Sequence, residues 1–369
     1  MKKKKISVVK PSLPDIKDLV PYLEQIWDSR ILSNGGPFHK KLEDELCKYL
    51  EVPYVSLVSN CTIGLIIALR IIKIKGEVIT SPFSFLATAN SIVWNNLKPV
   101  FVDVDPITAN INPEKIEAAI TPNTSAIMPI HAYGYPCDVD KIESIAKKYK
   151  LKVIYDAAHA FGIKYKQRSV LDYGDMSVLS FHATKVFNTF EGGAIICKNK
   201  NIKKLIDEFK NFGFSGETTA AQIGFNGKMS EFNAALGLLQ LKKIDSDIEK
   251  RKIIDGKYRT ALKNIQGIRC HVKLDNGRNN YSYFPIFIDQ KYKLSRDDLY
   301  QKLKDNQIYV RRYWHPLITD FSIYKKNKNN SEKNLTNSVK IAESVICLPI
   351  YPDLTEKEIN RIVGVIKST

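Results

Sequence analysis

The chain has 369 residues, with 56 Lys and Arg against 39 Asp and Glu, which gives a formal net charge of +17. This length is typical of two domains, and a hydrophobic share of 44% excludes an intrinsically disordered chain. The longest uncharged stretch, residues 78–97, holds Pro, Ser, Thr and Asn and is too polar for a membrane span, and no apolar signal segment follows the lysines near residue 1, so we expect a cytoplasmic protein.

From about residue 52, short runs rich in Val and Ile alternate with helical patterns. These runs mostly lack polar alternation, which indicates strands that are buried on both faces. We expect strands at Tyr54–Val58, Glu77–Thr80, Pro99–Val104, Ser125–Ile130, Lys152–Tyr155, Met176–Phe181 and Ala194–Cys197. Helices are expected at about 62–73, 84–95, 113–120, 138–149 and 201–211. This alternation predicts an α/β fold, with a largely parallel sheet covered by helices.

An amphipathic pattern at about 229–247 is expected to form a long helix that leads into a second unit. Beyond residue 250 the pattern is sparser, and the expected elements are strands at Tyr283–Ile288 and Ile308–Arg312 and helices at 295–304 and 355–367. We therefore predict a large domain over residues 1–245, which includes the N-terminal segment, and a smaller C-terminal α+β domain over residues 246–369.

The positive charge is compatible with a nucleic-acid-binding surface, but its distribution favours a background enrichment in lysine without a functional role. The lysines form short scattered groups such as residues 147–150, in a chain that is also rich in Ile and Asn. No RNP, KH or zinc-finger spacing occurs. We therefore expect no nucleic-acid partner and no membrane insertion.

The six cysteines are too far apart for a C-x-x-C metal or redox pair, and we expect no metal site. Cys197 and Cys347 lie in apolar runs that are typical of buried strands. The sequence also lacks a G-x-G-x-x-G turn after its first strand and lacks a P-loop, so neither a dinucleotide site nor a P-loop NTPase is supported.

Ligands of open α/β sheets bind beyond the carboxyl ends of the strands. The side chains expected there are an amine, a carboxylate, hydroxyls, an aromatic ring and imidazoles, with no metal cluster and no G-x-S-x-G nucleophile. The residues that bear on chemistry are Cys61, Thr62, Ser84, Phe85, His131, Asp156, His159, Ser180 and Lys185.

Lys185 is the candidate nucleophile of this set. A free lysine has a pKa of about 10.4 and is mostly protonated, but a lysine desolvated at the end of a buried strand loses its proton more readily and can form a Schiff base. The alternative is an ordinary surface lysine. Ser180 before it and Glu191-Gly192-Gly193 after it frame a loop that can approach a ligand, which favours the functional interpretation.

Three further residues allow both a structural and a functional interpretation. Asp156 ends an apolar run and is either a turn residue or, beside a Schiff-base lysine, the partner of a protonated pyridine nitrogen. Thr62 opens a helix after a strand, where an N-cap and a phosphate site are compatible. Phe85 is either a core residue or a face stacked on a planar ring.

These residues, taken with others along nearly the whole chain, resemble the nucleotide-sugar aminotransferases of the DegT/StrS type. The matching segments are Ser33–Phe38, Pro82–Asn90, Pro99–Asp103, His131–Gly134, Asp156–His159, Ser180–Gly193, Gly224–Glu231 and Leu348–Thr355. Members of this family are fold-type-I enzymes that use pyridoxal 5′-phosphate (PLP). The resemblance thus implies an aspartate aminotransferase-like large domain with a mostly parallel seven-stranded sheet and a smaller C-terminal domain.

The resemblance also assigns roles around the cofactor. Lys185 would hold PLP covalently, and Asp156 would pair with its pyridine nitrogen. His159 would lie against the ring or its 3′-oxygen, with Phe85 stacked on the opposite face.

The phosphate of the cofactor would be bound from two subunits. Cys61 and Thr62, in the place of the usual Gly-Thr, would bind it together with Ser180. Asn226 would reach the same phosphate from the neighbouring subunit, so the family pattern implies a homodimer with a shared active site. Cys61 is the departure from this pattern.

The implied reaction is a ping-pong transfer of an amino group from L-glutamate to the 4-keto carbon of a nucleotide-linked 4-keto-6-deoxy sugar, for surface polysaccharide biosynthesis. His182 and the Glu191-Gly-Gly loop look like those of members that aminate C4. Segments 9–14 and 21–27 look most like those of members that act on dTDP-4-keto-6-deoxyglucose and form dTDP-4-amino-4,6-dideoxyglucose. A C3-aminotransferase and a UDP- or GDP-linked 4-aminotransferase are the alternatives.

The substrate contacts are less constrained than the cofactor contacts. His182 either touches the sugar or is a packed imidazole. Arg312, Tyr313 and His315 either line the sugar-diphosphate side, where Arg suits phosphate, or form a solvated strand end. Two rival functions are a sugar dehydratase of the same family, in which histidine replaces the lysine, and a non-catalytic regulatory protein. Lys185 argues against the dehydratase.

Overall fold

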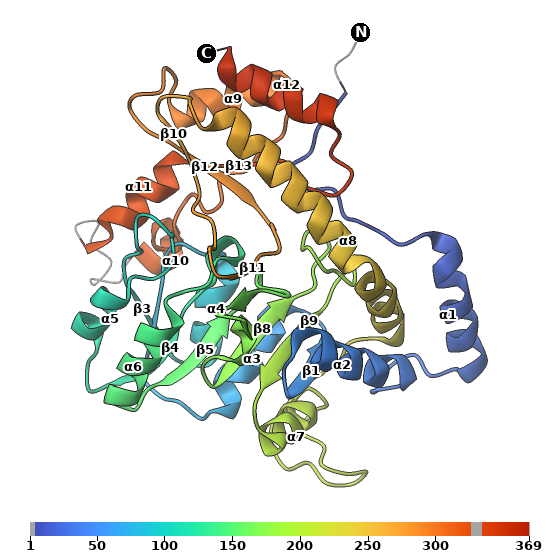
Figure 1. Cartoon of the computed structure of the whole chain (residues 1–369). Coiled ribbons are helices and arrows are strands. Elements are labelled where there is room, and N and C mark those ends of the chain that lie inside the picture. Colours follow the sequence, from blue (N-terminus) through green and yellow to red (C-terminus); the bar gives the residue numbers. More distant parts are fainter. Residues whose placement is uncertain (1–3, 326–333, 369) are drawn as a thin grey trace.

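The structure is a computed structural model, which describes residues 4–325 and 334–368 (Figure 1). A seven-stranded sheet with the order β1-β9-β8-β5-β4-β2-β3 forms its centre. These strands are β1 (Tyr54–Val58), β2 (Glu77–Thr80), β3 (Lys98–Phe101), β4 (Thr124–Met128), β5 (Lys152–Asp156), β8 (Met176–Ser180) and β9 (Gly193–Cys197). Strand β9 is antiparallel to both of its neighbours, and the other six strands run in one direction. The predicted, mostly parallel seven-stranded sheet is confirmed.

The helices predicted between these strands are also present (Figure 1). They are α3 (Cys61–Ile71), α4 (Leu86–Trp94), α5 (Pro113–Ala119), α6 (Val139–Tyr149) and α7 (Lys200–Phe209). Two N-terminal helices precede the sheet and were not predicted, namely α1 (Ile16–Ser29) and α2 (Pro37–Leu50). Helix α2 packs against β1 and the long helix α8 (Glu231–Leu262), so its place is set by residues distant in the sequence.

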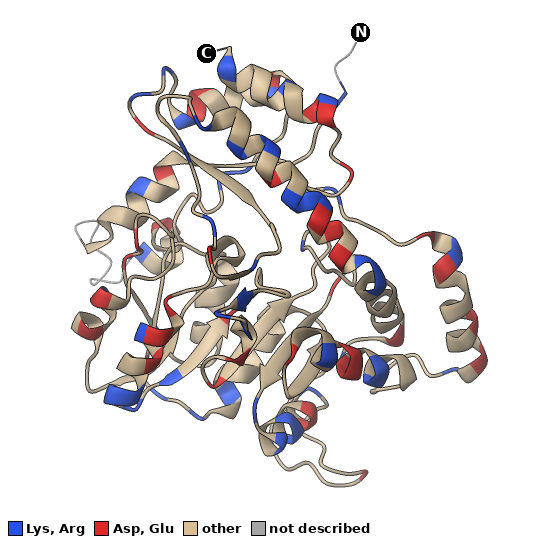
Figure 2. Ribbon diagram, in the orientation of Figure 1, with Lys and Arg blue, Asp and Glu red and all other residues tan. Residues whose placement is uncertain are grey.

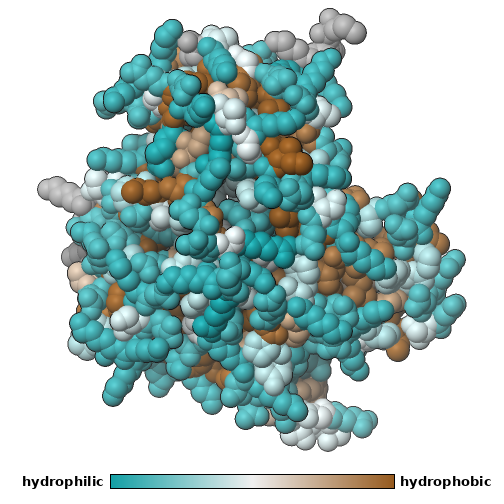
Figure 3. Space-filling view, in the orientation of Figure 1, coloured by the Kyte–Doolittle hydropathy of each residue, from teal (hydrophilic) through white to brown (hydrophobic). Residues whose placement is uncertain are grey.

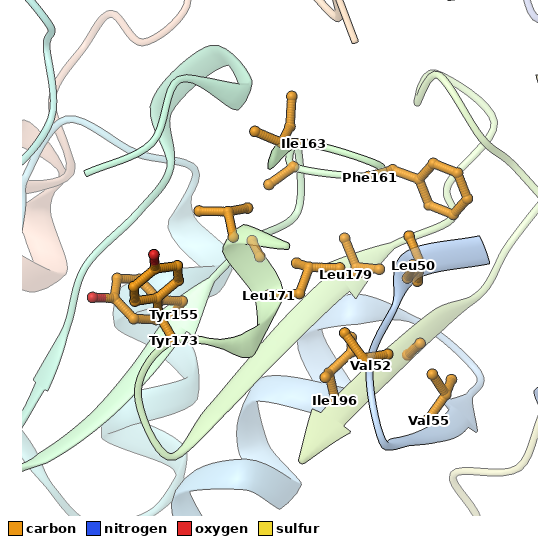
Figure 4. Close-up of a cluster of buried hydrophobic side chains, with 14 of the residues drawn as sticks. Leu50, Val52, Val55, Tyr155, Phe161, Ile163, Leu171, Tyr173, Leu179 and Ile196 are labelled. Atoms are coloured by element: carbon orange, nitrogen blue, oxygen red, sulfur yellow. The ribbon is translucent and has the colours of Figure 1, made fainter. Parts of the chain in front are cut away.

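The main core lies where the helices cover the sheet (Figure 4). All five residues of β8 and all five of β9 are buried, as expected for strands covered on both faces. Side chains from α2, the sheet and the following loops meet there, including Leu50, Val55, Tyr155, Phe161, Leu179 and Ile196. This packing fixes the strand ends that carry the polar residues.

The C-terminal part is built on a second, antiparallel sheet with the order β10-β12-β13. Its elements are β10 (Ile268–Cys270), β12 (Phe284–Ile288), β13 (Val345–Leu348), α9 (Arg296–Asp305), α10 (Ser322–Lys325), α11 (Thr336–Ser344) and α12 (Glu356–Lys367). A three-stranded ribbon of β6 (Lys164–Tyr165), β7 (Arg168–Ser169) and β11 (Gly277–Arg278) joins segments from both halves of the chain.

Helix α8 connects the two parts and crosses the predicted boundary at residue 245. Ala234 and Leu238 near its start pack in the main core, whereas Ile254 and Tyr258 pack in the C-terminal cluster. This continuing buried face carries the helix to Leu262, well beyond its expected end near residue 247. The division into domains at 245 stays a prediction.

The expected strand Ile308–Arg312 is wrong. Only Ile308 and Arg311 form isolated bridges, and they pair with different segments, Ile6 and Cys347. Because the two partners belong to different parts of the chain, no continuous ladder forms along this stretch.

Lys and Arg are interspersed with Asp and Glu on most helices (Figure 2). Among the described residues, no helix is both long enough and apolar enough to cross a membrane.

Candidate active site

A cavity of about 280 Å³ lies at the carboxyl ends of the central strands. Ten of the predicted site residues line it, and they come from five separate segments of the chain. They are Cys61, Thr62, Ser84, Phe85, Asp156, His159, Ser180, His182, Lys185 and Tyr313. The structure therefore brings together most of the set that the strand ends predicted.

Lys185 lies in the turn that follows β8. Its backbone N–H donates to the His182 carbonyl at 2.9 Å, and its Nζ donates to the Tyr283 hydroxyl at 3.4 Å. Burial lowers the pKa of Lys185 below its ordinary value, and the nearby Cys61, Asp156 and Tyr313 oppose that effect. Because a lower pKa leaves more of the amine neutral, this environment favours its use as a nucleophile or base.

Asp156 ends β5 and is 5% exposed. Its carboxylate accepts hydrogen bonds from Thr88 Oγ1 at 2.7 Å and from the Ala158 N–H at 3.2 Å, while Thr88 also contacts the Ser84 hydroxyl at 2.8 Å. Burial raises the pKa of Asp156, and the hydrogen bonds and Lys185 lower it. A carboxylate has about four lone-pair positions, so Asp156 retains acceptor capacity for a cationic N–H group in the cavity.

The other end of the cavity is the N-terminus of α3. Asn60 caps the helix by accepting from the Ile63 N–H at 2.9 Å, and Cys61 and Thr62 begin its first turn. A Cβ at Gly193 would come within 2.8 Å of the Cys61 nitrogen, so only glycine permits this close approach of β9. Free N–H groups and the helix dipole make such a terminus suitable for a phosphate.

The imidazole of His159 has one ring nitrogen, Nδ1, that can form a hydrogen bond with a ligand. The ring stacks on Trp314 at a centroid distance of 5.3 Å and meets Tyr283 edge-on at 5.0 Å. Its Nδ1 is buried and has no hydrogen-bond partner in the structure as described. Burial holds the pKa of His159 well below its ordinary value, so the imidazole is neutral. A buried orphan nitrogen at a cavity wall indicates that a ligand completes the site.

Four predicted residues do not line this cavity. His131 is fully buried and stacks on the ring of Tyr155 at a centroid distance of 4.7 Å. Arg312 pairs with Asp297 at 2.6 Å and lies over the Tyr300 ring, and His315 is exposed. Asn226 is exposed as well and pairs through its backbone with Asn211, away from the cavity of its own subunit.

Two other predicted residues lie at the cavity mouth. Phe85 is 65% exposed, which leaves its ring free for a ligand. His182 contacts the Thr184 hydroxyl at 2.8 Å and Glu191 at 3.6 Å.

Sequence reasoning missed three residues of the site, Thr88, Tyr283 and Trp314. Thr88 could have been found, because it follows Ser84 by one helical turn within the helix expected at 84–95. Tyr283 and Trp314 come from the C-terminal part of the chain, where no local pattern signals contact with the strand ends. No group of three His, Cys, Asp or Glu side chains suited to a metal occurs in residues 4–325 or 334–368.

Comparison with known proteins agrees with this geometry. Two curated relatives, from Shigella dysenteriae and Escherichia coli, both bear the name dTDP-4-amino-4,6-dideoxy-D-glucose transaminase. They are 52% and 49% identical to this chain, over 99% and 98% of both proteins respectively.

Two solved structures share the fold. DesI, with its TDP-sugar product, has a TM-score of 0.93 and 32% identity over 99% of this chain and 92% of its own. NtdA of Bacillus subtilis, with bound cofactor PMP, has a TM-score of 0.89 and 29% identity over 100% of this chain and 86% of its own. The model of the DegT/DnrJ/EryC1/StrS aminotransferase family matches residues 15–367, and the chain belongs to this family.

Proposed function

We propose that this aminotransferase moves an amino group from L-glutamate to C4 of dTDP-4-keto-6-deoxyglucose, giving dTDP-4-amino-4,6-dideoxyglucose. The observation that carries the substrate assignment is the 52% identity, over 99% of both proteins, with the Shigella dysenteriae transaminase named for that product. DesI, whose structure was solved with a TDP-sugar product, supports the same nucleotide.

The cofactor of the proposed reaction is PLP, and the cavity has a group for each part of it. Lys185 supplies the amine that would hold the aldehyde carbon, Asp156 supplies an acceptor for the ring nitrogen, and the start of α3 with Thr62 and Ser180 supplies the phosphate site. His159 Nδ1 is available to a ring substituent. When bound, PLP provides an electron sink for the carbanion formed at Cα of the amino donor.

The chain's own residues perform the remaining tasks in this proposal. Lys185 would carry the proton from Cα of the donor to the cofactor carbon that bore the aldehyde, as a general base and then a general acid. In the second half-reaction it would carry a proton from that carbon to C4 of the acceptor sugar. Asp156 keeps the ring nitrogen protonated, because its buried carboxylate is stabilised by a neighbouring cation. Trp314 and Tyr283 line the cavity from the C-terminal part of the chain.

The test offers the purified holoenzyme L-glutamate with dTDP-, UDP- and GDP-4-keto-6-deoxy sugars in parallel. Visible absorbance should bleach on addition of glutamate, and the dTDP-sugar should be aminated at C4 fastest, as shown by mass spectrometry and NMR of the product. A faster UDP or GDP arm, or amination at C3, would refute the substrate assignment. Failure to bleach would refute the reaction itself.

We also propose a homodimer in which each subunit completes the other's cavity. Large apolar side chains are exposed on α1 and on the segment after α7. These side chains are Ile16, Val20, Trp27, Phe212, Phe214 and Ile223. Hydrophobic residues gather on the α1 side of the molecule, at the right of Figure 3. Such surfaces are typical of subunit interfaces. Asn226 follows this segment and does not line its own cavity, so its assigned phosphate contact requires the partner.

Complementation tests this arrangement. Lys185→Ala and Asn226→Asp homodimers should each be nearly inactive, the second because a carboxylate repels the phosphate. Unfolding and refolding them together should restore about a quarter of wild-type activity, since half of the dimers are hybrids with one intact site. No recovery, with hybrids verified by differential tags, would refute the shared site.

A further inference from the structure

Tyr283, on the C-terminal side of the cavity, contacts the lysine amine directly. Its hydroxyl oxygen accepts a hydrogen bond from Lys185 Nζ at 3.4 Å across a sequence separation of 98 residues. The amine also lies over the Tyr283 ring, 6.0 Å from its centroid. Tyr283 immediately precedes β12, so the contact joins the second sheet to the chemistry at the end of β8.

The backbone around Tyr283 is anchored to the turn that follows β5. Asn280, which is fully buried, donates to the carbonyls of His159 at 2.8 Å and Phe161 at 2.9 Å. The Ser282 hydroxyl donates to the same His159 carbonyl at 3.1 Å. These bonds fix the segment that carries Tyr283 relative to the turn after β5, so its hydroxyl has a defined position in the cavity.

The ring of Tyr283 is held from three sides. It meets His159 at 5.0 Å, Tyr313 at 5.7 Å and Tyr133 at 5.8 Å, all in edge-on arrangements. Rings packed in this way resist reorientation. Burial raises the pKa of Tyr283 well above its ordinary value, so the hydroxyl stays protonated and neutral at working pH.

We propose that Tyr283 is a positioning residue that orients the Lys185 amine for proton transfer. When the phenol oxygen accepts an N–H of the neutral amine, the lone pair on Nζ points away from the tyrosine and into the cavity. In the transfer step the Cα–H bond of the donor breaks, Nζ takes the proton, and the electron pair goes to the cofactor acting as electron sink. An amine of fixed direction makes this step faster without changing how glutamate binds.

The inference rests on the proposed role of Lys185, and its test is Tyr283→Phe, which removes one oxygen and keeps the ring. Tyr258→Phe is the matched control, because Tyr258 is a fully buried tyrosine whose hydroxyl donates to the Pro349 carbonyl at 2.9 Å, within the C-terminal cluster. Each variant is reacted with L-glutamate and with glutamate deuterated at Cα, and bleaching is followed by stopped flow. Separately, each apoprotein is mixed with PLP, and the rate at which visible absorbance appears is measured.

Tyr283→Phe should slow bleaching by roughly 10- to 100-fold with little change in the KM for glutamate. Its deuterium isotope effect should rise above the wild-type value, and apoprotein capture of PLP should slow because the same amine attacks the aldehyde. Tyr258→Phe should leave all three unchanged. Wild-type rates in Tyr283→Phe would overturn the inference. A fall in rate with an unchanged isotope effect would overturn it as well, because that result indicates general structural damage. Failure of the wild-type enzyme to bleach would instead refute the proposed function.

Discussion

Thr88→Val is expected to shift the acid side of the pH–activity profile upward. Thr88 is fully buried and donates to Asp156 Oδ2 at 2.7 Å, and the Ala158 N–H at 3.2 Å is the weaker second donor. Burial already raises the pKa of Asp156, and the Thr88 hydrogen bond is the largest influence that lowers it. Valine has nearly the same shape as threonine but cannot donate, so the ionised carboxylate loses its stronger partner.

The shift follows from the type of bond that is lost. A hydrogen bond to a charged group contributes about 1.5–3 kcal/mol. Because this bond stabilises only the ionised carboxylate, its loss should raise the pKa of Asp156 further above its ordinary value. The ionised form, which in the proposed function keeps the cofactor's ring nitrogen protonated, is present above this pKa and is lost as the pH falls through it. Activity should therefore disappear at a higher pH in the variant than in the wild type.

The measurement is kcat against pH for the glutamate half-reaction. Thr80→Val is the matched control, since Thr80 is equally buried but donates to the neutral Met128 carbonyl at 2.8 Å. Thr80→Val should lose about 1 kcal/mol of stability and Thr88→Val about 1.5–3 kcal/mol, whereas only Thr88→Val should move the acid limb. An unmoved limb, or an equal movement in both variants, would show that the Thr88 bond does not control the ionisation of Asp156.

Three further substitutions test other parts of the site. Lys185→Ala, expressed with PLP, should lose the yellow colour and all turnover, and unchanged activity would contradict the role of Lys185. Gly193→Ala should weaken PLP binding to the apoprotein by about 1–3 kcal/mol, because the new Cβ would meet backbone atoms of Cys61 and Leu179 at 2.8 Å. Gly364→Ala is the control, since its Cβ would enter open space on α12, and it should leave PLP binding unchanged. Glu231→Ala should lower the free energy of unfolding in urea by about 1–3 kcal/mol, since its buried carboxylate accepts from the Phe38 and His39 N–H groups at the start of α2. Glu231→Gln, which retains an acceptor oxygen, should lose less.

The central sheet and most of the cavity could be predicted because their signals are local. Each buried strand is a continuous apolar run, and each ligand-facing residue follows the end of such a run, as Asp156 follows Val153–Tyr155. In a parallel sheet these ends lie at one edge, so sequence order alone brings Thr62, Asp156 and Lys185 together.

The parts that were missed have two causes. Helices α1 and α2 were overlooked although each carries a local helical signal. Ile16, Leu19, Leu23 and Ile26 share one face of α1, and the buried residues Phe38, Leu42, Leu46 and Leu50 recur every four residues in α2. The start of α2 is held by Glu231, 193 residues after Phe38. The failed strand at 308–312 has the other cause, distant partners, since its two bridges pair with Ile6 and Cys347.

The electrostatics of the cavity favour one kind of occupant. Burial lowers the pKa of Lys185 and raises that of Asp156, so both groups are driven toward their neutral forms unless a partner compensates. At the other end, the first turn of α3 favours an anion. A planar ligand can interact favourably with all three groups if it has a cationic N–H for Asp156, a phosphate for the first turn of α3 and an electrophilic carbon for Lys185. In the proposed function, this arrangement would bind the cofactor by its charges and would leave Lys185, once displaced, as a neutral base beside the reacting carbon.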